Sequence, residues 1–128
     1  MKGTHVKIIK SLAAALIALF AVAGLAGCAE PEPMNAADYA AVIDVRTVEE
    51  WNAGRLDGAV RIGIADPDFT QQLSALDPSA DYYIYCRSGN RAGQAIDIMR
   101  DMGFTGELVN GGAVANASSQ LGIPVVVD

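Results

Sequence analysis

The stretch that decides the fold is YYIYCRSGNRA, which spans residues 82–92. Its first four residues are aromatic or apolar, as in a strand that is buried in a sheet. The run ends at Cys86, and a polar loop leads into a helix expected from about Arg91 to Met102. A buried strand followed at once by a loop and a helix is typical of a parallel α/β sheet.

Similar elements flank this stretch on both sides. The apolar, β-branched run at residues 41–45 predicts a second buried strand. Thr47 and Glu50 have the spacing of a capping box, which predicts a short helix that stops near Gly54. The other expected elements are a strand at 59–62, a helix with Asp66 as N-cap and Pro67 at its first position, a strand at 106–109, a weak helix at 113–121 and an edge strand at 123–127.

The alternation of strands with short helices sets the predicted fold class. It is α/β, with a small, open, mainly parallel sheet flanked by short helices and joined by right-handed crossovers. In open sheets of this kind the functional site lies beyond the carboxyl ends of the strands. Cys86 is expected at such an end.

The first 28 residues form a different kind of segment. Lys2, Lys7 and Lys10 precede an apolar run at 12–24, and LAGC follows at 25–28. A basic start, a short apolar run and small residues are typical of an export signal. The stretch resembles a bacterial lipoprotein signal, which implies cleavage before Cys28 and lipidation of its sulfur. Several acyl chains give stable membrane anchoring, which a single chain does not.

These observations predict three segments. Residues 1–27 are the lipoprotein signal peptide, residues 28–37 are a lipidated N-terminus with an acidic, proline-rich tether, and residues 38–128 are the folded domain. The expected location is extracytoplasmic, lipid-anchored to a bacterial membrane, and the domain is expected to be a monomer.

Composition excludes several classes of function for the chain after residue 27. Without the lysines and His5, six arginines stand against 15 acidic residues, a formal balance of −9. Such a charge opposes binding to nucleic acid. Without histidine there is no Ser-His-Asp triad, Cys-His pair or histidine-ligated metal, and two cysteines at 28 and 86 form no CxxC pair. No metal and no cofactor are expected.

The loop CRSGNR at residues 86–91 is the candidate site. If it curls around Cys86, the free N–H groups of the following helix start form an anion-binding nest. Arg87 and Arg91 add positive charge, and Gly89 supplies backbone freedom for a tight curl. These features predict a Cys86 thiolate with a lowered pKa. The alternative is a buried structural cysteine.

The whole region from about residue 38 to 128 resembles a single-domain rhodanese. The loop at 86–91 resembles the active loop of that family. The other matching pieces are DVR at 44–46 with Glu50 and Trp51, GRLDGA at 54–59, and NGG at 110–112. Arg55 stands where the family usually has histidine, and the tryptophan usual after the glycine pair is absent. The first strand and helix before Asp44 look truncated.

The resemblance implies a sulfurtransferase. Cys86 would take a sulfane sulfur from a donor such as thiosulfate and pass it from a persulfide to a thiol or cyanide acceptor. The substrate would meet Arg87, Ser88, Gly89, Asn90 and Arg91. Arg87 is expected at the mouth of the site and Arg91 under the loop as a brace, with Glu50 either its partner or only part of the capping box. Asp44 and Arg46 are expected to be scaffold.

Two other functions stay open at this point. Some relatives on the same fold are phosphatases or arsenate reductases, although their loop is one residue longer because a tetrahedral oxyanion needs a wider cradle. The second alternative is a non-catalytic binding or redox-sensing module tethered to the membrane. Turnover of thiosulfate, of a phosphate ester, or of neither distinguishes the three.

Overall fold

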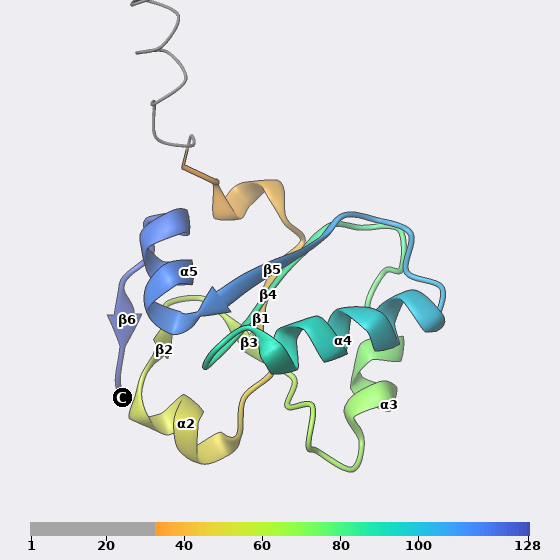
Figure 1. Cartoon of the computed structure of the whole chain (residues 1–128), viewed down its shortest axis with the longest axis horizontal. Coiled ribbons are helices and arrows are strands. Elements are labelled where there is room, and N and C mark those ends of the chain that lie inside the picture. Colours follow the sequence, from red (N-terminus) through yellow and green to blue (C-terminus); the bar gives the residue numbers. More distant parts are fainter. Residues whose placement is uncertain (1–32) are drawn as a thin grey trace, which may run out of the picture. The chain divides into compact units, whose positions relative to one another are not determined.

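The computed structural model describes residues 33–128, so Cys28 and the expected signal segment lie outside the described residues (Figure 1). Residues 33–128 form one compact unit. Its elements are η1 (Ala36–Asp38), β1 (Ala41–Asp44), α2 (Val48–Ala53), β2 (Arg55–Leu56), β3 (Val60–Arg61), α3 (Phe69–Ser74), β4 (Tyr82–Cys86), α4 (Asn90–Asp101), β5 (Leu108–Ala113), α5 (Val114–Leu121) and β6 (Val125–Val126).

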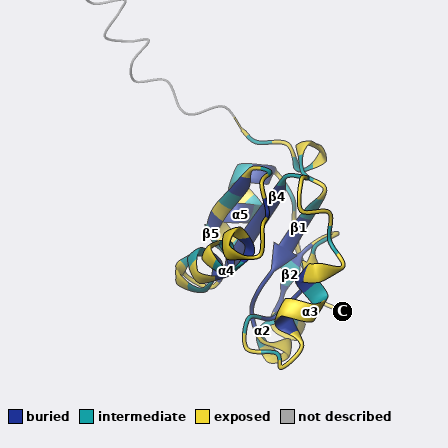
Figure 2. Ribbon diagram, turned by 90° about the vertical axis from the view of Figure 1, so that its right-hand side faces the viewer, coloured by how far each residue is buried: buried dark blue, intermediate teal, exposed yellow. Residues whose placement is uncertain are grey.

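The main sheet has the strand order β3-β1-β4-β5, and every neighbouring pair in it is parallel. The predicted α/β class with a mainly parallel sheet is therefore confirmed. β1 and β4 lie in the middle and are almost completely buried, as Figure 2 shows by their dark blue colour. Because all four strands point the same way, their carboxyl ends lie at one edge, and Cys86 is at that edge.

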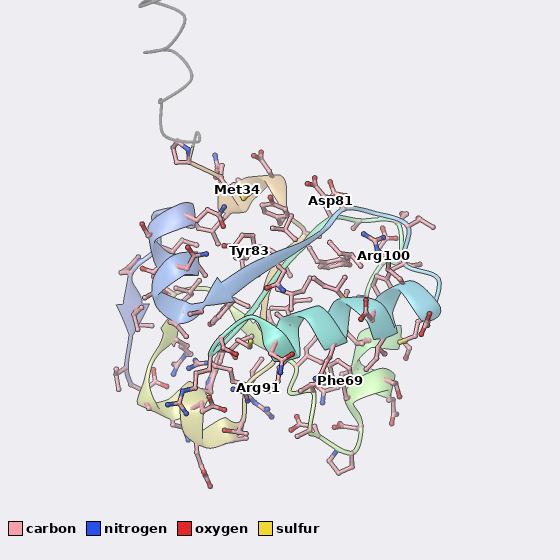
Figure 3. All side chains as sticks on the ribbon, viewed as in Figure 1. Met34, Phe69, Asp81, Tyr83, Arg91 and Arg100 are labelled. Atoms are coloured by element: carbon pink, nitrogen blue, oxygen red, sulfur yellow. The ribbon has the colours of Figure 1, made fainter. Side chains whose placement is uncertain are left out.

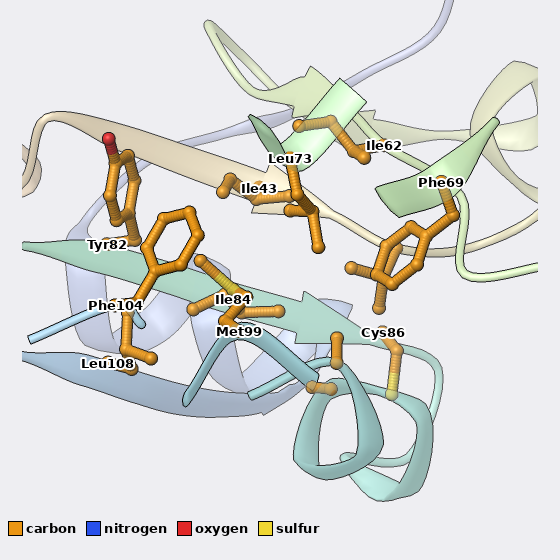
Figure 4. Packing of buried hydrophobic residues seen from close by; sticks show 13 residues of the cluster. Ile43, Ile62, Phe69, Leu73, Tyr82, Ile84, Cys86, Met99, Phe104 and Leu108 are labelled. Atoms are coloured by element: carbon orange, nitrogen blue, oxygen red, sulfur yellow. The ribbon is translucent and has the colours of Figure 1, made fainter. Parts of the chain in front are cut away.

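Each face of the sheet has its own hydrophobic core. Along β4, Tyr82, Ile84 and Cys86 face one core, where Phe69 and Leu73 of α3 and Ala95 of α4 pack against them (Figure 4). The alternate residues Tyr83 and Tyr85 face the other core, together with Leu56, Ala117 and Leu121. This alternation follows from the two-residue period of a strand, and it directs the Cys86 side chain toward α4.

The expected start of the third helix is wrong. α3 begins at Phe69, with Asp68 rather than Asp66 at the N-cap position. The carboxylate of Asp66 instead accepts hydrogen bonds from the guanidinium of Arg61, at 2.8 and 3.3 Å. Arg61 on β3 therefore binds the Asp66 carboxylate, which the local pattern had assigned to the N-cap of the helix.

The C-terminal strands also differ from the pattern. β5 spans Leu108–Ala113, so it starts later than the strand expected at 106–109 and continues through Asn110, Gly111 and Gly112. β2 was not expected as a strand. It pairs antiparallel with β6 in a separate two-stranded sheet, with Leu56 opposite Val125. The strand expected at 123–127 is thus shorter, Val125–Val126, and belongs to this small sheet instead of an edge of the main one.

The folded unit begins earlier than residue 38. The backbone N–H of Met34 donates to the Gln120 carbonyl at 3.1 Å. Met34 and Ala36 also pack against the core that contains Tyr83 (Figure 3). These residues of the expected tether therefore contact the domain. Among residues 33–128, no helix is long and apolar enough to cross a membrane.

Candidate active site

Cys86 ends β4 and is completely buried beside the first turn of α4 (Figure 4). The backbone N–H of Gly89 donates a hydrogen bond to its Sγ atom at 2.9 Å. Gly89 has a φ of +94°, in the left-handed region that favours glycine, and a Cβ there would lie 3.2 Å from the Cα of Gly112. The loop therefore curls over the sulfur as the sequence predicts, and only glycine fits at the turning point.

The backbone around Cys86 stabilises its thiolate. Burial by itself would raise the pKa of the Cys86 thiol, because it disfavours the charged form. The backbone N–H groups of Ala92, Ser88, Gly89 and Arg91 outweigh that effect, and the pKa is lowered. The lowered pKa that the sequence predicts is confirmed in direction, and its strongest causes are backbone groups rather than arginine charges.

Arg91 extends from the first turn of α4 to α2 (Figure 3). Its two terminal nitrogens donate to the two carboxylate oxygens of Glu50 at 2.7 and 2.9 Å. Glu50 also completes the capping box, because Thr47 Oγ1 accepts from its backbone N–H at 3.2 Å. Both roles considered for Glu50 are therefore present. Mainly because of Arg91, the pKa of Glu50 falls from 4.5 to about 2.

The rest of the loop faces solvent. Arg87, Ser88 and Asn90 are exposed, and within residues 33–128 Arg87 forms no ion pair. The Ser88 hydroxyl accepts a long hydrogen bond of 3.5 Å from the backbone N–H of Asn90. Arg87 thus keeps a free positive charge beside the loop, whereas the charge of Arg91 is already matched by a carboxylate.

A second contact to the loop comes from β5, and it was not predicted. The side-chain amide of Asn110 donates to the Gly89 carbonyl at 2.9 Å, and its oxygen accepts from the N–H of Gly112 at 3.0 Å. The sequence indicates only the bond between Asn110 and Gly112, because an asparagine side chain readily accepts from the backbone N–H two residues further on. The contact with Gly89, 21 residues away, has no local signature.

Comparison with known proteins places this chain in a family. Residues 31–117 match the Rhodanese-like domain. The chain belongs to the rhodanese-like domain family. It is 30% identical over 73 residues to thiosulfate sulfurtransferase PspE of Escherichia coli (strain K12), covering 57% of this chain and 68% of the relative. It is 32% identical over 84 residues to putative sulfurtransferase YtwF of Bacillus subtilis (strain 168), covering 66% of this chain and 80% of the relative.

Solved structures agree with that assignment. A rhodanese with anions from Escherichia coli has 26% sequence identity and a TM-score of 0.57, covering 69% of this chain and 98% of that one. A rhodanese-like domain from Anabaena sp. has 28% identity and a TM-score of 0.59, covering 69% of this chain and 92% of that one.

In this rhodanese-like domain, the end of β1 carries a buried ion pair. The carboxylate of Asp44 is fully buried and accepts from the guanidinium of Arg46 at 2.7 and 3.0 Å. Arg46 also donates to the Gly54 carbonyl at 2.6 Å. The pair ties β1 to the end of α2, as expected of scaffold.

Arg55, at the position of the usual histidine of the rhodanese family, is not at the sulfur. Its guanidinium lies over the Trp51 ring, 4.7 Å from the ring centroid, and pairs with the carboxylate of Asp128. The substitution therefore stabilises the contact between α2 and β2 through a cation–π interaction.

Proposed function

We propose that this protein is a sulfurtransferase in which Cys86 carries a sulfane sulfur as a persulfide. Membership of the rhodanese-like family, and relatives named as sulfurtransferases at about 30% identity, support a sulfurtransferase-type role. The observation that carries the proposal is the contact between Cys86 Sγ and the Gly89 N–H, within a loop whose N–H groups lower the pKa of the thiol.

The proposed donor is thiosulfate. The Cys86 thiolate attacks the outer sulfur of the donor, a new S–S bond forms, the S–S bond of thiosulfate breaks, and sulfite leaves with its electron pair. The product is a persulfide anion, and the charge is the same on both sides of the step. An acceptor thiolate or cyanide then attacks the terminal sulfur, and the Cys86 thiolate leaves, as in thiol–disulfide exchange.

We propose a different task for each arginine of the loop. Arg87 is exposed and has no ion-pair partner in the described chain, so it attracts the dianionic donor to the mouth of the site. Arg91 is held by Glu50 and braces the loop. Ser88, Gly89 and Asn90 present the backbone that surrounds the transferred sulfur.

Intact mass measurement after thiosulfate treatment tests the proposal. Wild-type protein should gain one sulfur atom, and cyanide should remove it with formation of thiocyanate. Cys86→Ser serves as the control and should gain nothing. A wild-type protein with an unchanged mass and no thiosulfate turnover would instead support the non-catalytic module, and phosphate-ester turnover would support the oxyanion enzyme.

We also propose that Cys28 is the lipidated N-terminus and that the domain is extracytoplasmic. The basic leader, the apolar run and LAGC at 25–28 support this proposal. Wild-type protein should be found processed in the membrane fraction, and Cys28→Ser should be soluble or unprocessed. A processed Cys28→Ser protein in the membrane fraction contradicts lipid anchoring through Cys28.

A further inference from the structure

We propose that Asn110 is a positioning residue for the Cys86 thiolate, because its side-chain amide holds Gly89 with its N–H directed at Sγ. This inference deepens the proposed function, since it assigns part of the site's activation to a residue on β5. Asn110 does not touch the sulfur. It acts through the backbone of Gly89, so its effect differs from that of a residue in the loop itself.

Regular pairing with β4 places Asn110 beside the loop, and an irregularity in β5 follows it. Ile84 of β4 pairs with Asn110 of β5, whereas Cys86 pairs with Ala113. β5 therefore has one residue more than β4 between these two pairs, and that extra residue is a β-bulge. Gly112, within the bulge, has a φ of +72°. Asn110 precedes the bulge and lies, like its partner Ile84, on the side of the sheet that carries α4. The bulge that follows brings the Gly112 N–H to the Asn110 oxygen.

The Asn110 side chain makes two hydrogen bonds at opposite ends of its amide. The nitrogen donates to the Gly89 carbonyl at 2.9 Å, and the oxygen accepts from the Gly112 N–H at 3.0 Å. The second bond fixes the direction of the amide, so that its donor remains aimed at Gly89. Asn110 thereby ties the bulge of β5 to the turning point of the active loop.

Gly89 needs this restraint because it is the most permissive residue in the backbone. Its N–H donates to Cys86 Sγ at 2.9 Å. Its carbonyl accepts from two donors, the Gly93 N–H at 3.0 Å and the amide of Asn110. Because both the N–H and the carbonyl of Gly89 are held, its φ of +94° is maintained and its N–H remains directed at the sulfur. Without the amide, Gly89 samples other orientations, and the thiolate loses part of its stabilisation.

The test is the pH dependence of Cys86 alkylation by iodoacetamide. The experiment uses the Cys28→Ser chain, in which Cys86 is the only cysteine. In Asn110→Ala the alkylation midpoint should rise by about half a pH unit, because a hydrogen bond to a charged group is weakened. Well below the midpoint, this lowers the alkylation rate about threefold.

Asn116→Ala is the matched control. The Asn116 side chain also donates to a backbone carbonyl, that of Gly111 at 2.7 Å, but it does not bond the active loop. This variant should leave the alkylation midpoint unchanged even if its thermal stability falls as much as that of Asn110→Ala. A midpoint that moves equally in both variants indicates a general loss of stability and overturns the inference.

Asn110→Ser keeps the inference testable if the alanine variant does not fold. A serine hydroxyl can accept the Gly112 N–H but is too short to hold the Gly89 carbonyl. The midpoint should therefore rise in this variant as well, and a wild-type midpoint overturns the inference. Alkylation measures the thiolate and needs no sulfur donor. The role of Asn110 can therefore be contradicted while sulfur transfer is confirmed, and sulfur transfer can be contradicted while the role of Asn110 is confirmed.

Discussion

At two neighbouring strand ends in this domain, a buried acidic group is stabilised in different ways. At the end of β1, the buried carboxylate of Asp44 is neutralised by Arg46 at 2.7 Å. At the end of β4, the buried sulfur of Cys86 meets the backbone N–H groups of the loop. A side-chain ion pair satisfies a charge and makes it inert. Backbone dipoles stabilise a thiolate without pairing it to a side chain, so the same edge of the sheet carries both a scaffold ion pair and the proposed nucleophile.

Replacing the sulfur should give the largest effect. Cys86→Ser should reduce sulfur transfer to background, because a hydroxyl cannot hold a persulfide. Serine is nearly the same size as cysteine, so the circular dichroism spectrum should be that of wild type. Thiocyanate formation from thiosulfate and cyanide measures the change. Transfer at the wild-type rate in this variant contradicts the assignment of the reactive strand end.

Breaking the ion pair at the other strand end should cost stability instead. Asp44→Ala leaves the buried guanidinium of Arg46 without its carboxylate, which should destabilise the domain by about 3–5 kcal/mol. Urea unfolding measures this loss. Replacing both partners, Asp44→Leu with Arg46→Met, should recover part of it, because no unpaired charge then remains. If Asp44→Ala unfolds like wild type, the pair is not the scaffold we describe.

Arg91 is intermediate between the two strand ends, because it belongs to the loop around Cys86 but forms an ion pair with Glu50. Arg91→Ala removes the bidentate contact with Glu50 and should cost about 1 kcal/mol of unfolding free energy. Thermal unfolding should show a decrease of about 5 °C in Tm. An unchanged Tm, with loss of donor binding, would mean that Arg91 contacts the donor and does not brace the loop.

The same pair gives a pH dependence. The pKa of Glu50 is about 2 in the folded protein, below its ordinary value of 4.5. Its contribution to stability is therefore fully present above about pH 4.5 and is lost as the pH falls toward 2. Arg91→Ala should reduce this acid loss, so its stability should approach that of wild type at low pH. Chemical denaturation at pH 7, 4 and 2.5 tests this, and a constant difference between the two proteins contradicts it.

Arg87 should show the smallest effect. It is exposed, and an exposed charge contributes up to about 1 kcal/mol to binding an anion. Arg87→Ala should therefore raise the KM for thiosulfate up to about fivefold and leave Tm unchanged. The effect should shrink at high salt, because screening weakens exposed charge pairs. Arg100→Ala is the control, since Arg100 lies in the last turn of α4, far along the helix from the loop.

Sequence reasoning predicted the parts of the site that depend on short-range pattern. The strand that ends at Cys86, the glycine turn at Gly89 and the capping box at Thr47 all involve residues within four positions of each other. The local helix-cap pattern fails where a charged side chain on a neighbouring strand competes. Asp66 had the right spacing for an N-cap, but Arg61 on β3 offers a charged donor, and charge-assisted bonds are stronger than bonds to neutral N–H groups.

The sequence by itself determined the α/β alternation, the position of Cys86 at a strand end and the lowered pKa of its thiol, because these follow from the hydrophobic period and from the free N–H groups at a helix start. Only the tertiary structure decided what holds the loop in place. Glu50 lies 41 residues from Arg91, and Asn110 lies 21 residues from Gly89. Such contacts depend on strand order and on register, which places Asn110 beside Ile84 on the α4 side of the sheet.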